Sequence, residues 1–127
     1  MTARRCTVVT GGADNWCTPF VERLVERLGR TADATLLFSH DEVTRSDIVF
    51  YLGYHSVVPL ATLALSGNNV VVHGSDLPYG RGWSPLSWQI IDGYKNIKVT
   101  LIEADDKVDS GNIYMQTSKK FKGHELL

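Results

Sequence analysis

The 127-residue chain is predicted to fold as one α/β domain, a Rossmann-like three-layer sandwich with a mostly parallel sheet. Short apolar segments typical of strands alternate along it with segments of helical periodicity. The consecutive valines Val70–Val72 predict a central strand that is covered on both faces. This strand ends at His73, and glycine and proline follow. A titratable side chain at the carboxyl end of such a strand marks the place where open α/β sheets bind ligands.

The composition excludes several classes of protein. With 43% hydrophobic and 21% charged residues, the chain is globular rather than disordered. A formal net charge of −1 gives no reason to expect nucleic acid as a partner, and no apolar run reaches the length of a membrane span. Cys6 and Cys17 lack metal-ligand spacing and predict free thiols in a reducing compartment. We therefore expect a cytoplasmic protein that binds neither nucleic acid nor a membrane.

The first half of the chain predicts strands at 5–12, 34–38 and 47–52. Thr18-Pro19 opens a helix with an apolar stripe that ends at Gly29; the stripe is Phe20, Val21, Leu24, Val25 and Leu28. The glycine pair after the first strand does not form a GxGxxG fingerprint, and a tight turn explains it equally well. At the carboxyl end of that strand, we expect Asn15 and Trp16 to face whatever binds there.

The second half begins with a short helix over 59–65 and a turn at 67–69 that leads into the central strand. Ser84 is the expected N-cap of a second helix, with Pro85 in its first turn and Gly93 after its end. Strands are expected at 97–103 and 113–117, separated by a polar loop at 104–111, and an antiparallel arrangement of these last strands is left open. Residues 123–127 resemble an uncompleted first helical turn, so the chain is either unusually short or a fragment.

Three histidines, His40, His55 and His73, follow predicted strands and could share one edge of the sheet. A zinc site is one interpretation, but no acidic or cysteine ligand stands at a telling offset, and no metal is predicted. The simpler interpretation of His73 alone is a strand-end histidine bonded to a backbone carbonyl.

The wider pattern changes that interpretation. His73-Gly74-Ser75-Asp76-Leu77-Pro78, then Arg81-Gly82, Ser84-Pro85 and Trp88, then Asp109-Ser110-Gly111-Asn112-Ile113, resembles the formyltransferases that use N10-formyltetrahydrofolate. Gly53-Tyr54-His55-Ser56-Val57-Val58-Pro59 is similar to the folate-side loop of that family. The resemblance covers about residues 47 to 117 and implies an abbreviated formyltransferase core.

The resemblance implies His73 and Asp109 as a catalytic pair. Formyl transfer requires the attacking amine to lose a proton and the carbonyl oxygen to be stabilised, and a histidine can do either. Folate-side residues are assigned at Tyr54, Ser56, Val57, Val58, Asp105 and Asp106. Acceptor-side residues are assigned at Gly12, Asn15, Ser75 and Arg81. Arg81 is explained equally well as a solvated charge.

The resemblance implies formyl transfer from N10-formyltetrahydrofolate to a primary amine. The expected acceptor is the amine of a nucleotide-linked amino sugar. The family normally carries an asparagine two residues before the histidine, where this chain has Val71. Two alternatives stay open: a 10-formyltetrahydrofolate hydrolase on the same scaffold, and a non-catalytic folate-binding domain. A homodimer is also left open.

Overall fold

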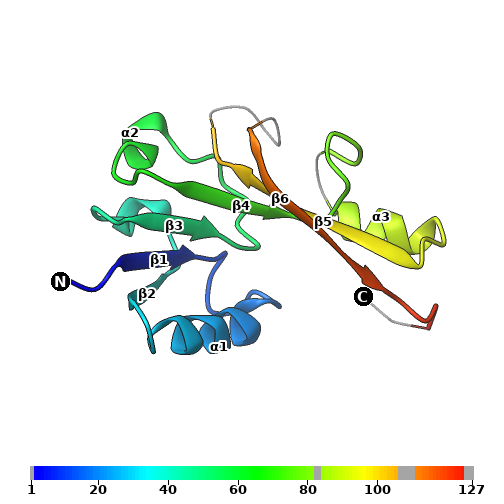
Figure 1. Cartoon of the computed structure of the whole chain (residues 1–127), viewed down its shortest axis with the longest axis horizontal. Helices are drawn as coiled ribbons and strands as arrows, with labels where there is room; N and C mark the ends of the chain where they lie inside the picture. Colours follow the sequence, from blue (N-terminus) through cyan, green and yellow to red (C-terminus); the bar gives the residue numbers. More distant parts are fainter. Residues whose placement is uncertain (1, 82–83, 106–110, 125–127) are drawn as a thin grey trace.

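The computed structural model describes residues 2–81, 84–105 and 111–124, and these form one six-stranded sheet with flanking helices (Figure 1). Its strands are β1 (Arg5–Val9), β2 (Asp33–Leu37), β3 (Ile48–Tyr51), β4 (Asn69–His73), β5 (Asn96–Glu103) and β6 (Ile113–Lys120). Its helices are α1 (Thr18–Leu28), the short 3₁₀ turn η1 (His40–Glu42), α2 (Leu60–Leu63) and α3 (Pro85–Ile91).

The strand order is β2-β1-β3-β4-β5-β6. The strands from β1 to β4 pair in parallel, whereas β5 is antiparallel to β4 and β6 is antiparallel to β5. The predicted α/β fold with a mostly parallel sheet is thus confirmed. The carboxyl ends of β1, β3 and β4 share one edge, and the loops that follow these strands carry most of the predicted site.

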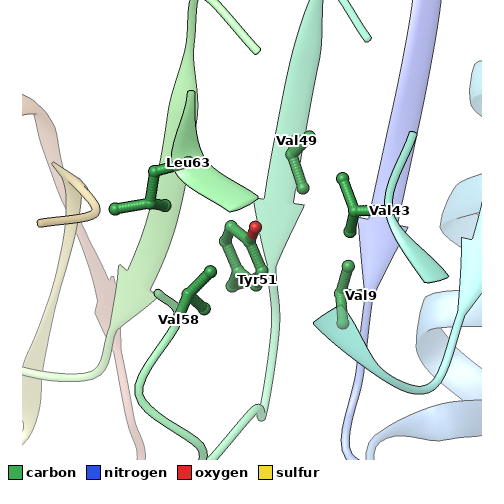
Figure 2. Packing of buried hydrophobic residues seen from close by; sticks show 6 residues of the cluster. All are labelled: Val9, Val43, Val49, Tyr51, Val58 and Leu63. Carbon is green, nitrogen blue, oxygen red and sulfur yellow. The ribbon is translucent and has the colours of Figure 1, made fainter. Parts of the chain in front are cut away.

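One face of the sheet packs against α2 and the segment after η1. The buried cluster on this face joins the strands β1 and β3, the helix α2 and two connecting segments (Figure 2). It contains Val9, Val43, Val49, Tyr51, Val58 and Leu63. This cluster fixes both ends of the segment that leads from β3 into α2.

The opposite face packs against α1. Successive residues of a strand point to opposite faces, so Val8 faces α1 while Val9 joins the cluster around Tyr51. Val21 is the buried contact of α1 on this side, together with Cys17 just before the helix. The predicted stripe is wrong at Phe20, which is exposed and lies beneath the guanidinium of Arg23. Helices on both faces complete the three layers.

The strand β4 is covered less completely than its valines predict. Val70 is buried, but Val72 is 36% exposed. The helix α1 packs mainly against β1 and β2, so the outer part of this face receives less cover. A run of valines therefore did not require burial on both sides.

The start of α3 also differs from the expected cap. Ser84 precedes the helix with φ of 53° and ψ of 44°, and its side chain makes no capping hydrogen bond. An N-cap residue typically has extended backbone angles, and Ser84 departs from them. The end of the helix is as predicted, with Gly93 at a φ of 80°. Within the described ranges, no helix has the length and apolar character needed to cross a bilayer.

The core around Tyr51 gives a stability prediction. Val49 is fully buried, so V49A should lower the free energy of unfolding by about 2–3 kcal/mol through lost apolar burial and the cavity left behind. V57A, at a valine that is 64% exposed, should change it by less than about 0.5 kcal/mol. Urea denaturation followed by circular dichroism measures both values. Equal midpoints for the two variants would contradict the assigned core.

Candidate active site

His73 is the last residue of β4 and its side chain is buried. Its Nε2 atom lies 2.8 Å from the backbone oxygen of Gly80. A carbonyl oxygen only accepts, so in this hydrogen bond Nε2 carries the proton and donates it. This is the bond that the simpler interpretation of a strand-end histidine predicts. Its geometry also fixes the orientation of the ring.

Gly80 is suited to this contact because of its backbone conformation. Its φ is 72°, and a Cβ atom there would lie 2.8 Å from Cβ of Ser75. Any other residue would therefore meet both backbone strain and a clash. The glycine lets the loop after β4 fold back and bring its carbonyl to the imidazole.

The loop from Gly74 to Gly80 is held by side chains of β5 and β6. The hydroxyl of Thr100, which is fully buried, donates to the backbone oxygen of Ser75 at 2.7 Å. The side-chain amide of Gln116 donates to that same hydroxyl at 3.1 Å and to the backbone oxygen of Leu77 at 3.1 Å. It also lies 3.3 Å from a carboxylate oxygen of Asp76. These bonds satisfy backbone groups that the loop removes from water.

Gln89 of α3 secures the beginning of the same loop. Its amide nitrogen donates to the backbone oxygens of Gly74 and Lys98, and its amide oxygen accepts from the backbone N–H of Lys98 at 3.1 Å. The β4–β5 ladder ends at the pair His73 and Thr100, so Lys98 lies beyond the last residue of β4. The glutamine side chain takes the place that a further strand residue would fill.

Two predicted acceptor-side residues belong to this loop. Ser75 is buried, and its hydroxyl donates to the backbone oxygen of Tyr79 at 2.7 Å. Its hydroxyl proton is thereby used inside the loop. Arg81 is exposed at the end of the loop. The acceptor-side assignments of both residues stay predictions.

The loop after β1 lies against the loop after β3. The side chain of Asn15 donates to the backbone oxygen of Gly53 at 3.3 Å and accepts from the backbone N–H of Cys17 at 3.0 Å. The backbone oxygen of Gly12 accepts from the hydroxyl of Thr18 at 2.6 Å. The structure thus brings the predicted acceptor-side and folate-side segments together, and Asn15 is the side chain that connects them.

The folate-side segment divides into anchored and exposed residues. Val58 packs its side chain into the core around Tyr51, whereas Ser56 and Val57 are exposed. Tyr54 is half-buried, and its hydroxyl is hydrogen-bonded to His40. The expectation that backbone atoms at 56–58 bind a flat heterocycle is compatible with this arrangement and stays a prediction.

The second predicted loop is described only at its ends. Asp105 is half-buried, while Asp106 and Asp109 lie outside the described residues. Gly111 follows this loop, and a Cβ atom there would overlap the backbone oxygen of Glu103. Close approach to the end of β5 therefore explains the glycine of the Asp109-Ser110-Gly111 motif.

Val71 occupies the strand position two residues before His73, on the same face of the sheet. It packs against the core around Tyr51 and offers no hydrogen-bond donor from its side chain. Asn69 was expected in the preceding turn but is the first residue of β4. Its amide nitrogen donates to the backbone oxygen of Leu63 at 2.9 Å, so its side chain is hydrogen-bonded to the last residue of α2.

The histidines that could suggest a metal have separate partners. His40 contacts Tyr54, and His73 contacts the backbone of Gly80. Throughout the described ranges, no group of three histidine, cysteine, aspartate or glutamate side chains is placed to bind a metal ion.

Sequence reasoning missed the three side chains that hold the loop after β4: Gln89, Thr100 and Gln116. A polar residue in a strand or helix is ordinarily interpreted as facing solvent. The available signal was weak, because Thr100 and Gln116 occupy cross-strand positions that could be recognised only once the register of β5 and β6 was known.

Comparison with known proteins identifies relatives for most of the chain. A family model described as formyl transferase matches residues 30–125. The bifunctional polymyxin resistance protein ArnA from Wigglesworthia glossinidia brevipalpis is 37% identical over 79 residues, which is 61% of this chain and 12% of that protein. The chain therefore spans only a small part of the length of this curated relative.

Solved structures share the fold. Methionyl-tRNA formyltransferase from Clostridium thermocellum has a TM-score of 0.74 at 23% identity, covering 91% of this chain and 52% of that one. HypX from Aquifex aeolicus, in complex with tetrahydrofolic acid, has a TM-score of 0.77 at 18% identity, covering 95% of this chain and 22% of that one.

The loop after β4 gives a second stability prediction. T100V keeps the shape of the side chain but removes the hydroxyl that joins Ser75, Leu77 and Gln116, so it should lower the free energy of unfolding by about 1–3 kcal/mol. T117V, on exposed β6, is the matched control and should change it by less than about 0.5 kcal/mol. Thermal unfolding of both variants measures these two changes in stability. A T100V protein as stable as T117V would show that the hydroxyl does not hold the loop.

Proposed function

Because the chain belongs to the formyl transferase family, we propose that it transfers a formyl group from N10-formyltetrahydrofolate to a primary amine. The proposed acceptor is an amino-sugar nucleotide, because the stretch from Asp76 to Pro85 resembles that of sugar-nucleotide N-formyltransferases. The tetrahydrofolic acid in the HypX structure, which shares the fold, supports a folate donor. Two buried free thiols, Cys6 and Cys17, support a reducing, cytoplasmic location.

The observation that carries the proposal is the placement of His73. It stands at the carboxyl end of β4, with its ring fixed by the backbone of Gly80, at the edge shared by the loops after β1 and β3. With Nε2–H donated to that carbonyl, Nδ1 carries the lone pair of the neutral ring. We assign the imidazole of His73 to proton transfer.

The proposed reaction forms a bond between the acceptor nitrogen and the formyl carbon. The bond between that carbon and N10 of the folate breaks. His73 accepts the proton that the amine loses, and a proton delivered to N10 completes tetrahydrofolate as the leaving group. Asp109 is proposed as the partner of His73, since a nearby carboxylate stabilises the protonated imidazole.

Val71 changes how the formyl oxygen can be stabilised during the proposed reaction. Its side chain cannot stabilise the developing negative charge on the formyl oxygen, and the hydroxyl of Ser75 already donates to Tyr79. Losing one such donor ordinarily costs a factor of about 10²–10³ in rate. We assign the remaining stabilisation to backbone N–H groups and to His73 once it is protonated. The proposed enzyme is accordingly slower than relatives that carry asparagine.

The test measures tetrahydrofolate release from N10-formyltetrahydrofolate, with and without a panel of 4-amino-sugar nucleotides. Wild-type protein should release tetrahydrofolate only when an acceptor is present. H73A should lose a factor of about 10²–10⁴, the usual contribution of a general acid–base group. H124A, which changes an exposed histidine near the end of the chain, should retain full activity.

Each alternative gives a different result. Full activity in H73A would remove His73 from the chemistry. Formate release without any acceptor would identify a hydrolase. Folate binding without release under any condition would identify a binding domain, for which the missing donor at Val71 would be the reason.

A further inference from the structure

Tyr54 and His40 form a contact between the loops after β2 and β3. The hydroxyl oxygen of Tyr54 lies 2.6 Å from Nδ1 of His40 and 3.0 Å from the backbone nitrogen of the same residue. The two rings meet edge to face, with centroids 5.9 Å apart and planes at 85°. One tyrosine hydroxyl thus engages both the backbone and the side chain of one histidine.

Hydrogen-bond chemistry fixes the direction of the first bond, and the tautomer of His40 decides the direction of the second. The backbone N–H of His40 can only donate, so the hydroxyl oxygen of Tyr54 accepts from it. In the tautomer with the ring proton on Nε2, Nδ1 accepts the hydroxyl proton of Tyr54. Nε2 carries the ring proton in that tautomer and faces a carboxylate oxygen of Asp41 at 3.4 Å.

His40 is itself held firmly. It begins the 3₁₀ turn η1, and the hydroxyl of Ser39 accepts from the backbone N–H of Asp41 at 3.1 Å, which caps the turn. Val43, immediately after the turn, is buried in the core around Tyr51 (Figure 2). The partner of Tyr54 is therefore attached to the packed body of the domain.

Tyr54 lies between two other fixed points of its own loop. Gly53 accepts a hydrogen bond from Asn15, and the side chain of Val58 is buried in the core. Ser56 and Val57, which lie between Tyr54 and Val58, are exposed. The bonds to His40 therefore hold the loop next to Ser56 and Val57, which are expected to contact the folate.

We propose that Tyr54 is a positioning residue that holds the loop of residues 53–58 through His40, in place of contacting the folate with its hydroxyl. This inference rests on the proposed function, because it takes that loop as the folate-binding one. The hydroxyl of Tyr54 is already hydrogen-bonded to both the backbone and the ring of His40. Its removal should therefore loosen the loop and weaken folate binding indirectly.

The chain supplies a matched control in Tyr51. Its ring lies 5.9 Å from that of Tyr54, but its buried hydroxyl has no hydrogen-bond partner within the described part of the chain. Y54F and Y51F each remove one hydroxyl from the same aromatic pair. Y54F should raise the dissociation constant for tetrahydrofolate about tenfold, the usual worth of one or two hydrogen bonds, whereas Y51F should leave it unchanged.

His40 variants separate positioning from direct contact. H40A removes the acceptor for the Tyr54 hydroxyl and should weaken tetrahydrofolate binding, though less than Y54F, since the backbone N–H remains. H40N should restore most of the affinity, because an asparagine side-chain oxygen can accept the same proton. Adding H40A to Y54F should cause no further loss, since the partner is already absent.

Amide hydrogen exchange measured on the folate-free protein reports on the loop directly. The segment from 53 to 58 should exchange faster in Y54F than in wild type or Y51F. V21A, which weakens the opposite face of the sheet, controls for a general loss of stability and should leave tetrahydrofolate affinity intact.

Unchanged exchange and affinity in Y54F would overturn the proposal. So would a loss of affinity in Y54F that H40A does not share, because the Tyr54 hydroxyl would then act without His40. If the wild-type protein binds no tetrahydrofolate, the proposed function fails. The exchange comparison would still decide whether Tyr54 and His40 hold the loop.

Discussion

The structure depends on satisfying the backbone polar groups of the loop after β4 once they are buried. Orphaned buried carbonyl and amide groups are costly, and this loop folds back over the end of its own strand. Thr100, Gln116 and Gln89 supply the missing partners from β5, β6 and α3. Only with those bonds in place can Gly80 present its carbonyl to His73. The orientation of the candidate catalytic ring is therefore determined by side chains that lie on other elements.

This dependence divides the domain into two cooperating parts. The parallel strands, with a packed core on each face, form the base from which the loops after β1 and β3 project. The antiparallel hairpin of β5 and β6 supports the loop after β4 (Figure 1). Asn15 joins the first two loops, so the candidate site is assembled from segments that are far apart in sequence. A rigid scaffold of this kind is the usual support for functional loops.

Much of the fold could be predicted from local patterns, because apolar strands and helix punctuation are recorded in adjacent residues. Burial at Val72 was predicted wrongly, since it depends on where α1 packs, and this is a tertiary property. The prediction of an N-cap at Ser84 was wrong because a serine before a proline does not by itself fix the backbone angles. The placement of His73 at a strand end followed from sequence, but its partner Gly80 did not. Tyr54 was expected just after the third strand and lies there, while its bonds to His40 required two loops to be brought together.

Gln89 has a consequence for the solubility of the domain. Lys98 lies beyond the end of β4. Without Gln89, its backbone N–H and carbonyl would therefore form a short exposed sheet edge. Such edges recruit strands from other molecules and begin aggregation. The carboxamide of Gln89 has the same donor and acceptor pattern as a peptide group, and it occupies both positions from within the chain. One helical side chain thus acts as a substitute strand that protects the hairpin from unintended pairing.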